Sequence, residues 1–407
     1  MTGTTSSVKV YFQNLNAIRF IAAFLVVIHH TEQSKFDMHI PNYWNNAVVG
    51  MLGKLGVVLF FALSGFLISY LLFKEQEVTH TISIRDFYMR RMLRIWPLYF
   101  LTIGLAFFVY PFIPFLTQDA FPRSVVWHEL GTKLALYLFF LPNMAFTVFG
   151  MIPYVSQAWS IGAEEQFYLV WPVLNKAVKN KWLLMFAVMG FYTVVKHSFG
   201  YVLPLGPLMR VCIRFWDSTP IDCMAIGGLF AVILNEQSAF AARLRGVLFA
   251  KPVQWATLLL TVGLISTGLH IPYFHYEVYA VLFGILICNF AANPGRIFSM
   301  ENAWTNYLGK ISYGLYMFHP VVIVFSIRLL QKVGLLHDAI LYPLVVGLVV
   351  LMATLSYDFF EKRFINRKAK YAKVISGNEA KEAAEAAAAA MPPVVLLAHD
   401  ATTAKVG

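Results

Sequence analysis

The chain has 407 residues, of which 59% are hydrophobic and only 13% are charged. Soluble domains carry about 45–50% apolar and about 25% charged residues, so this composition leaves too few polar side chains to cover a water-facing surface. The apolar residues fall in blocks of about 17–25 with almost no charge, the length that crosses a hydrocarbon core about 30 Å thick. The composition therefore excludes a soluble fold and predicts an all-α, polytopic bundle of transmembrane helices.

The net charge of +11 indicates basic loops on the cytoplasmic side of a membrane, with some basic residues left for an anionic substrate. No nucleic-acid partner is expected. Three cysteines, Cys212, Cys223 and Cys288, lie in apolar segments without metal-ligand spacing, so neither a disulfide framework nor a metal site is expected. The N-terminus lacks a short apolar stretch with a cleavage site, so no cleaved signal peptide is expected.

Ten segments are apolar and long enough to be spans, and clusters of Lys and Arg follow every second one. This alternation predicts a multi-pass protein with both termini in the cytoplasm. The expected spans are residues 14–32, 48–73, 92–116, 160–178, 182–199, 219–236, 252–270, 275–293, 307–331 and 337–361.

Residues 125–158 are apolar but are interrupted by two prolines, an asparagine and a glycine. Counting them as a span would place the lysines of 176–181 outside, so a re-entrant or interfacial segment is expected. Such a segment is tolerated where its broken backbone is buried in protein or lines a cavity. The membrane domain is expected over 10–373, between a disordered cytoplasmic N-terminus (1–9) and a disordered or cloning-derived tail (374–407).

The first span contains three ionisable residues, Arg19, His29 and His30. Arg19 and His30 are eleven residues apart, almost three helical turns, so they share one face about 16 Å apart along the axis. A histidine can take and return a proton near neutral pH, which suits a general base acting on a hydroxyl group. Alternatively, Arg19 extends to the cytoplasmic interface and the histidines merely end the helix.

Several residues in or beside two other spans have structural interpretations. Ser64 and Gly65 are suited to close packing of helices, with a catalytic Ser64 as the weaker alternative. Trp159 and Ser160 fit an interfacial anchor and a helix cap.

The third span begins with a cluster of arginines, Arg90, Arg91 and Arg94. Arg91 and Arg94 are three residues apart and therefore face the same way, while Trp96 and Pro97 are expected to break the helix at the membrane entry. Guanidinium groups match phosphate oxygens in a bidentate manner, so the cluster suits a nucleotide phosphate. The alternative is an ordinary cluster of cytoplasmic basic residues.

Carboxylates in two of the apolar segments are candidate functional groups. Glu164 and Glu165 are at the first turn of their span, where the helix dipole favours a negative charge. Two adjacent carboxylates are costly in an apolar setting, so one is expected to pair with an arginine or histidine. Asp222 is alone in its span and is expected to have a charged partner.

The ninth span carries Ser312, Tyr316 and His319 on one face, because Ser312 and His319 are seven residues, or two turns, apart. These residues could contact a ligand. Alternatively, His319 contacts no ligand and simply forms a hydrogen bond with a backbone carbonyl that Pro320 leaves without a partner.

Together these motifs resemble the acyltransferase 3 family, integral-membrane acyltransferases of bacterial surface-polysaccharide O-acetylation. The resemblance covers roughly residues 10–365. Five motifs carry it in order: an Arg-x10-His pair (Arg19, His30), an FxLSGFLI-like segment (Phe61 to Ile68), RRxxRIxPxY (Arg90 to Tyr99), WSIGAEEQFYLVWP (Trp159 to Pro172) and ISYGLYMFHP (Ile311 to Pro320).

The resemblance implies a donor, typically acetyl-CoA or another acyl-CoA, bound from the cytoplasm. The acceptor it implies is a sugar hydroxyl of a cell-surface or lipid-linked glycan at the bacterial cytoplasmic membrane. The arginine and histidine of the first span and the Arg-x-x-Arg pair are regarded as functional in the family. Some relatives carry a fused extracytoplasmic hydrolase-like domain; this chain ends soon after its tenth span and is expected to be the stand-alone form.

The sequence therefore predicts a membrane O-acyltransferase whose partners are an acyl-CoA, a glycan and membrane lipid. His30 would act as general base or accept the acyl group itself, and Glu164 or Glu165 would orient it. A transporter or flippase for a glycan, or a lipid-binding membrane protein without chemistry, are the alternatives. The expected sites are catalytic His30, Arg19, Glu164 and Glu165, donor-binding Arg90, Arg91 and Arg94, and substrate-binding His319, Ser312, Tyr316 and Asp222.

Overall fold

A computed structural model describes residues 8–117, 122–201, 206, 211–213, 215–216 and 219–377. The described part is built almost entirely of helices, as the composition predicts. Six of the described helices are long and apolar enough to cross a membrane. A seventh span results if α10 (Asp222–Asn235) and α11 (Ala239–Phe249), which are bent by 109° relative to each other, are counted as one broken span. The six are α1 (Leu15–Asp37), α2 (Ala47–Thr79), α3 with η1 (Ile84–Phe112), α13 (His275–Ala292), α15 (Ser312–Lys332) and α16 with the turns that follow it (Asp338–Tyr371).

The expectation of about ten spans is not confirmed by these helices. A spanning helix needs about 20 predominantly apolar residues. α12 (Lys251–Thr267) has 17 residues, and α7 (Trp159–Ala177) includes two glutamates and a lysine among its 19. The sequence pattern counted such segments as full spans because it measures apolar content and not the length of the helix.

Residues 125–158 contain no long helix, in agreement with the expected interruption. They form three short helices and a 3-10 turn. Of the residues expected to break the segment, Gly150 and Pro153 lie between the helix Pro142–Phe149 and the turn Ser156–Ala158, whereas Pro142 and Asn143 are the first residues of that helix. The remaining elements are η1 (Tyr110–Phe112), η2 (Pro114–Leu116), α4 (Arg123–Trp127), α5 (Leu130–Leu138), α6 (Pro142–Phe149), η3 (Ser156–Ala158), α8 (Lys181–Tyr201), α10 (Asp222–Asn235), α11 (Ala239–Phe249), α14 (Ala303–Lys310), η4 (Tyr357–Glu361), α17 (Lys362–Ile365) and η5 (Asn366–Tyr371).

Local sequence explains where the helices begin and where they continue. α2 begins at Asn46, whose side chain accepts hydrogen bonds from the N–H groups of Val48 and Val49 at 3.0 and 3.3 Å. α3 (Ile84–Phe108) runs on through Pro97, so the expected break there is wrong. Membrane helices tolerate an internal proline because surrounding protein can satisfy the backbone groups that it frees.

The core of the bundle is the crossing of α2 with α10, and two glycines make it close. A β-carbon on Gly65 would lie 1.8 Å from the carbonyl oxygen of Met224, and one on Gly227 would lie 2.0 Å from that of Ala62. No side chain fits at either position. The packing role expected for Gly65 is therefore confirmed, and α2 is fixed against α10 along its middle.

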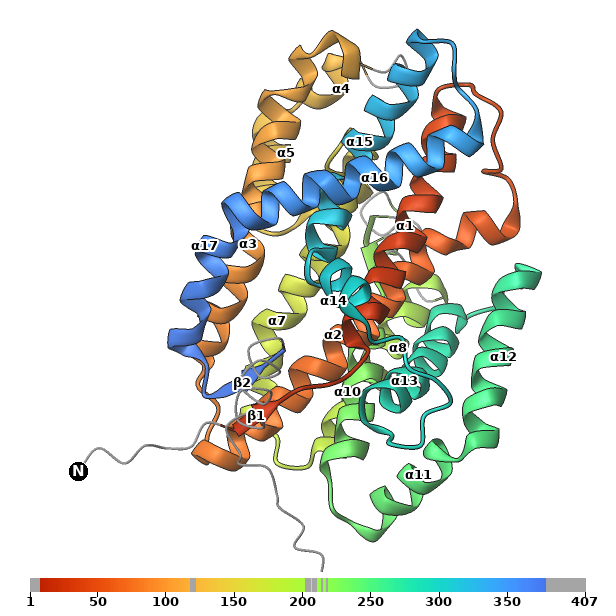
Figure 1. The fold of residues 1–407 in the computed structure, drawn as a ribbon. Helices are drawn as coiled ribbons and strands as arrows, with labels where there is room; N and C mark the ends of the chain where they lie inside the picture. Colours follow the sequence, from red (N-terminus) through yellow and green to blue (C-terminus); the bar gives the residue numbers. More distant parts are fainter. Residues whose placement is uncertain are drawn as a thin grey trace, which may run out of the picture.

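The two ends of the described chain meet in a two-stranded parallel pairing, with β1 (Val8–Val10) beside β2 (Val374–Ser376). Figure 1 shows the pair at one end of the bundle and the connection after α1 at the other. Residues 8–9 and 374–376, expected to be disordered, are thus in strands. The rest of the two expected disordered segments, apart from Gly377, lies outside the described residues.

Candidate active site

Two cavities lie within the bundle, and each collects one set of the predicted residues. The first, here called the arginine cavity, encloses about 1010 Å³ of empty space including its mouth. Arg19 reaches it from α1, Arg91 and Arg94 from α3, and Glu164 from α7. Ser312 and Tyr316 line it from α15. The structure therefore brings together residues from four helices that the sequence singled out separately.

The three guanidinium groups of the arginine cavity outnumber the one carboxylate that lines it, that of Glu164. Arg19 donates a hydrogen bond to the side-chain oxygen of Asn16 at 3.2 Å. The Nε of Arg91 is buried without a hydrogen-bond partner there, and none of the three arginines forms an ion pair. Positive charge gathered in a partly buried cavity favours an anion, and phosphate oxygens fit guanidinium geometry.

Glu164 lies on the wall of the same cavity, beside a serine. The Ser64 hydroxyl donates to Glu164 Oε1 at 2.6 Å, and the Tyr168 hydroxyl donates to Ser64 at 3.1 Å. The sequence favoured a packing role for Ser64; instead its side chain lines the cavity. Tyr168 was not predicted at all, although it lies one helical turn after Glu164 and an i, i+4 spacing gives it the same face.

Two residues grouped with this set lie elsewhere. Arg90 pairs with Glu75 at 2.8 Å and donates to the carbonyl of Tyr371, and it does not line the arginine cavity. Glu165 accepts a hydrogen bond from the Trp96 indole at 3.0 Å and lines neither cavity. The donor-binding role expected for Arg90 and the catalytic role expected for Glu165 stay predictions.

The second cavity, here called the histidine cavity, encloses about 1170 Å³ of empty space including its mouth. His29 and His30 line it from the far half of α1, and Lys54 lines it from α2. The Lys54 ammonium lies 4.2 Å from the centre of the Trp159 ring, which also lines this cavity. A lysine within a membrane span marks a functional position, so Lys54 is a residue that the sequence reasoning could have found.

Three histidines cluster at this cavity, and their backbone contacts fix the tautomer of each. Nδ1 lies 2.9 Å from the Val49 carbonyl in His29, 3.0 Å from that of Val26 in His30 and 2.7 Å from that of Tyr316 in His319. A carbonyl only accepts hydrogen bonds, so each Nδ1 carries the proton and each Nε2 is left as a base. The His30 and His319 rings are 4.8 Å apart.

These contacts settle two expectations about the histidines. His30 is oriented by the Val26 carbonyl, and Glu164 binds Ser64, so orientation of His30 by a neighbouring carboxylate is not what the structure has. His319 binds the Tyr316 carbonyl, four residues before Pro320, and Pro320 has no N–H to bind that carbonyl. The interpretation of His319 as the partner of a freed carbonyl is confirmed.

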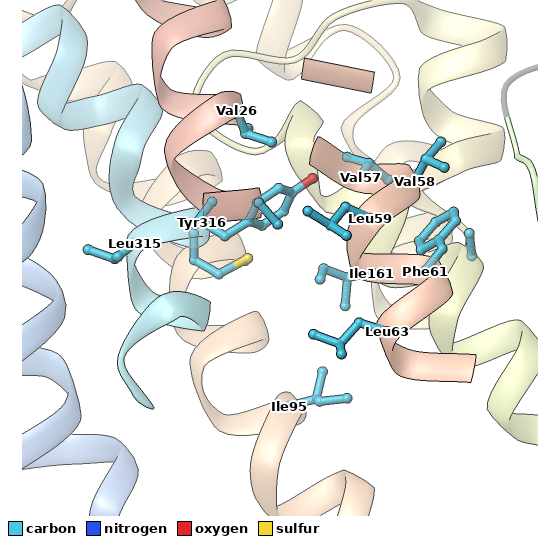
Figure 2. Packing of buried hydrophobic residues seen from close by; sticks show 14 of the residues in the cluster. Val26, Val57, Val58, Leu59, Phe61, Leu63, Ile95, Ile161, Leu315 and Tyr316 are labelled. Carbon is cyan, nitrogen blue, oxygen red and sulfur yellow. The ribbon is translucent and has the colours of Figure 1, made fainter. Parts of the chain in front are cut away.

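Tyr316 stands between the two cavities. Tyr316 and Val57 are the residues that line both of them. Figure 2 shows the Tyr316 ring between α15 and α2, with its hydroxyl directed toward Val57. Val57 and Tyr316 therefore form a wall that the two cavities share.

Asp222 lies on neither cavity wall. Its carboxylate accepts a hydrogen bond from the N–H of Cys223 at 3.0 Å. Lys196 and Glu277, which pair with each other at 2.9 Å, are its charged neighbours, and within the described residues Asp222 forms no ion pair of its own. Within the described ranges, no group of three or more His, Cys, Asp or Glu side chains is placed to hold a metal ion.

The described chain is a bundle of apolar helices with two neighbouring cavities, and sequence comparison defines its family. The family model described as an acyltransferase domain matches residues 12–358. The chain belongs to this acyltransferase 3 family. No solved structure is significantly similar to the chain.

Three relatives are 25% identical to the chain. The peptidoglycan O-acetyltransferase OatA of Listeria monocytogenes matches over 81% of this chain and 52% of its own length. The putative peptidoglycan O-acetyltransferase YrhL of Bacillus subtilis matches over 86% and 54%, and the O-acetyltransferase OatA of Staphylococcus aureus over 86% and 57%. The chain thus spans about half the length of these relatives.

Proposed function

We propose that the protein is a membrane O-acyltransferase that moves an acyl group, in the first instance acetyl, from an acyl-CoA to a hydroxyl group of a cell-envelope glycan. One observation carries the proposal. A cavity lined by three arginines that form no ion pair within the described residues shares a wall, at Val57 and Tyr316, with a second cavity that is lined by His30 with its basic Nε2. A polyanionic donor fits the first cavity and a neutral hydroxyl acceptor fits the second.

The donor is assigned to the arginine cavity because of its charge and shape. Arg91 and Arg94 would bind phosphate oxygens of CoA, and the unpartnered Nε of Arg91 supplies a free donor. The rest of the cavity wall includes Leu63, Leu67 and Ile95, which suit the thin pantetheine arm. The thioester would then reach the shared wall at Tyr316.

The acceptor is assigned to the histidine cavity. Trp159 and Tyr154 offer aromatic faces there, and Gln33 and Gln157 offer amide groups, a combination that suits a sugar. The relatives named for peptidoglycan make a cell-wall glycan the natural acceptor to test.

His30 would take the proton of the acceptor hydroxyl on Nε2 as the oxygen attacks the acyl carbonyl. Its Nδ1–H stays bound to the Val26 carbonyl and stabilises the protonated ring. Alternatively, Nε2 would first accept the acyl group and then pass it to the hydroxyl. Both routes require the same free Nε2.

The paired termini give the direction of transfer. Lys368 and Ser376, from the C-terminal segment, line the arginine cavity. If the termini lie in the cytoplasm, as the basic loops predict, the arginine cavity opens to the cytoplasm and the histidine cavity opens outward. Cytoplasmic acyl-CoA and an envelope glycan would then enter from opposite sides.

The test uses the purified protein in vesicles with radiolabelled acetyl-CoA and a soluble glycan acceptor. Because general base catalysis contributes about 100- to 10,000-fold, His30→Ala should lower transfer by that factor while acetyl-CoA still binds. Near-normal transfer by His30→Ala would remove His30 from the mechanism. Failure of the intact protein to bind acetyl-CoA would reject acetyl-CoA as the donor and its assignment to the arginine cavity.

A further inference from the structure

The wall that the two cavities share contains one polar side chain. Of the two residues that line both cavities, Val57 is aliphatic and Tyr316 carries a hydroxyl group. This inference rests on the proposed function: if donor and acceptor enter from opposite cavities, the acyl carbonyl must lie at this wall when the two meet. The Tyr316 hydroxyl is then the protein group beside the reacting bond.

The Tyr316 hydroxyl is held in place by its neighbours. It donates to the Gln157 carbonyl at 2.9 Å and lies 2.7 Å from the Ser160 hydroxyl. The Gln157 side chain is itself fixed, because its amide donates to the carbonyls of Met317 and Tyr154 at 2.9 and 3.0 Å. The position of the phenol is therefore set before any substrate arrives.

The other polar groups nearby are not equivalent. Ser160 lines the arginine cavity but not the histidine cavity, and its hydroxyl lies behind that of Tyr316. The Nδ1–H of His319 is already bound to the Tyr316 carbonyl. Nε2 of His30 must be free to act as a base. Tyr316 is left as the hydrogen-bond donor.

We propose that Tyr316 is a catalytic residue whose hydroxyl donates a hydrogen bond to the acyl carbonyl oxygen as negative charge develops on it. The acceptor oxygen bonds to the carbonyl carbon, and its proton passes to Nε2 of His30. The tetrahedral intermediate then collapses: the carbon–sulfur bond breaks, and sulfur leaves with the proton that His30 returns. The phenol O–H turns from the Gln157 carbonyl to the oxyanion, and Ser160 donates to the phenol oxygen, which strengthens the bond.

Steady-state kinetics of Tyr316→Phe test this role. Removing one donor from an oxyanion site lowers kcat by about 100- to 1000-fold. We expect that loss in Tyr316→Phe, with KM for acetyl-CoA within about twofold, since the phenol acts on the transition state. Tyr99→Phe is the matched control: its buried hydroxyl also donates to a carbonyl, that of Tyr137 at 2.8 Å, but Tyr99 lines neither cavity. A Tyr316→Phe protein with normal kcat would overturn the proposal.

A second measurement separates hydrogen bonding from packing and also serves if Tyr316→Phe does not fold. Fluorinated tyrosine at position 316 keeps the size and the hydroxyl group but donates a stronger hydrogen bond. A shift in kcat with the degree of fluorination supports the donor role, and an unchanged kcat contradicts it. The intact protein is the reference throughout: absence of transfer by it would reject the proposed function, whereas transfer that is indifferent to Tyr316 would reject this role alone.

Discussion

Single charged residues in this bundle divide into two groups by what lies beside them. A charge within a membrane is costly unless a partner or a ligand compensates it. In the described ranges, Arg19, Arg91 and Arg94 share a cavity and form no ion pair. Three other cations are paired with carboxylates: Lys35 with Glu32, Arg90 with Glu75 and Lys196 with Glu277.

The difference between Arg90 and Arg91 can be measured. Hydrogen bonds to charged groups contribute about 1.5–3 kcal/mol, so Arg91→Ala or Arg94→Ala should weaken acetyl-CoA binding by about 10- to 100-fold. Arg90→Ala should leave affinity within about twofold. It should instead lower the unfolding temperature, because Glu75, only 2% exposed, loses its cation. Equilibrium binding and thermal unfolding of the three variants check both outcomes.

Equal loss of acetyl-CoA affinity in Arg90→Ala and Arg91→Ala would contradict this division.

The sequence placed the three arginines in one group because they are close along the chain. Successive residues on a helix point about 100° apart and residues three apart share a face, so Arg91 and Arg94 line the arginine cavity together and Arg90 does not. That geometry was readable from the sequence; the presence of Glu75 opposite Arg90 was not.

At the scale of elements, the contact between α2 and α10 fixes the wall of the arginine cavity. Ser64 lines that cavity, and the next residue, Gly65, is the point of closest approach to α10. The backbone contact at Gly65 therefore sets where Ser64 and its partner Glu164 lie. A change that separates the helices should disturb both the fold and the site.

Gly65→Ala should destabilise the protein strongly, because its β-carbon would lie 1.8 Å from a backbone oxygen and one helix must move. Overpacking of this kind costs about 1–3 kcal/mol or more. Gly104→Ala in α3 is the matched control, since nothing lies within 4 Å of its β-carbon and alanine favours a helix. Thermal unfolding in detergent should show a clear loss for the first variant and none for the second; equal stability of the two would refute the close crossing.

The elements also show what the sequence could and could not predict. Charges are rare within apolar segments, and they singled out Arg19, His30, Arg91 and Arg94, which the structure places on the walls of the two cavities. The course of the chain at Pro97 was mispredicted, since whether a proline breaks a helix depends on neighbouring helices. The Val26 carbonyl that orients His30 lies four residues earlier on the same helix, whereas the position of Tyr316 on both cavity walls depends on contacts between helices, which spacing along one helix does not contain.

For the whole molecule, the arrangement of the two cavities is more informative than either alone. One is lined by residues of the C-terminal segment, which lies beside the N-terminal strand, and the other by the end of α1 that leads to the α1–α2 connection. The two therefore open toward different ends of the bundle (Figure 1). An acyl group passing from one to the other would cross the membrane interior without the donor itself crossing.

This arrangement predicts which residues can be labelled from each side of a membrane. In a protein whose native cysteines are replaced by alanine, single cysteines at the exposed positions Lys9, Lys373 and Asn45 should react with a membrane-impermeant maleimide. Cysteines at 9 and 373 should react from the cytoplasmic side alone, because β1 and β2 are paired and the basic loops lie there. A cysteine at 45, in the α1–α2 connection, should react from the outside alone.

Each contrary pattern has a distinct meaning. Labelling of 9 and 373 from opposite sides would contradict the pairing of β1 with β2, on which the position of the arginine cavity depends. Labelling of both from the outside would leave the pairing intact but open the arginine cavity outward, away from cytoplasmic acyl-CoA. The proposed function requires that cysteines at positions 9 and 373 react from the cytoplasmic side and that the cysteine at position 45 reacts from the outside. A donor and an acceptor on opposite sides of the membrane can meet at Tyr316 in that orientation alone.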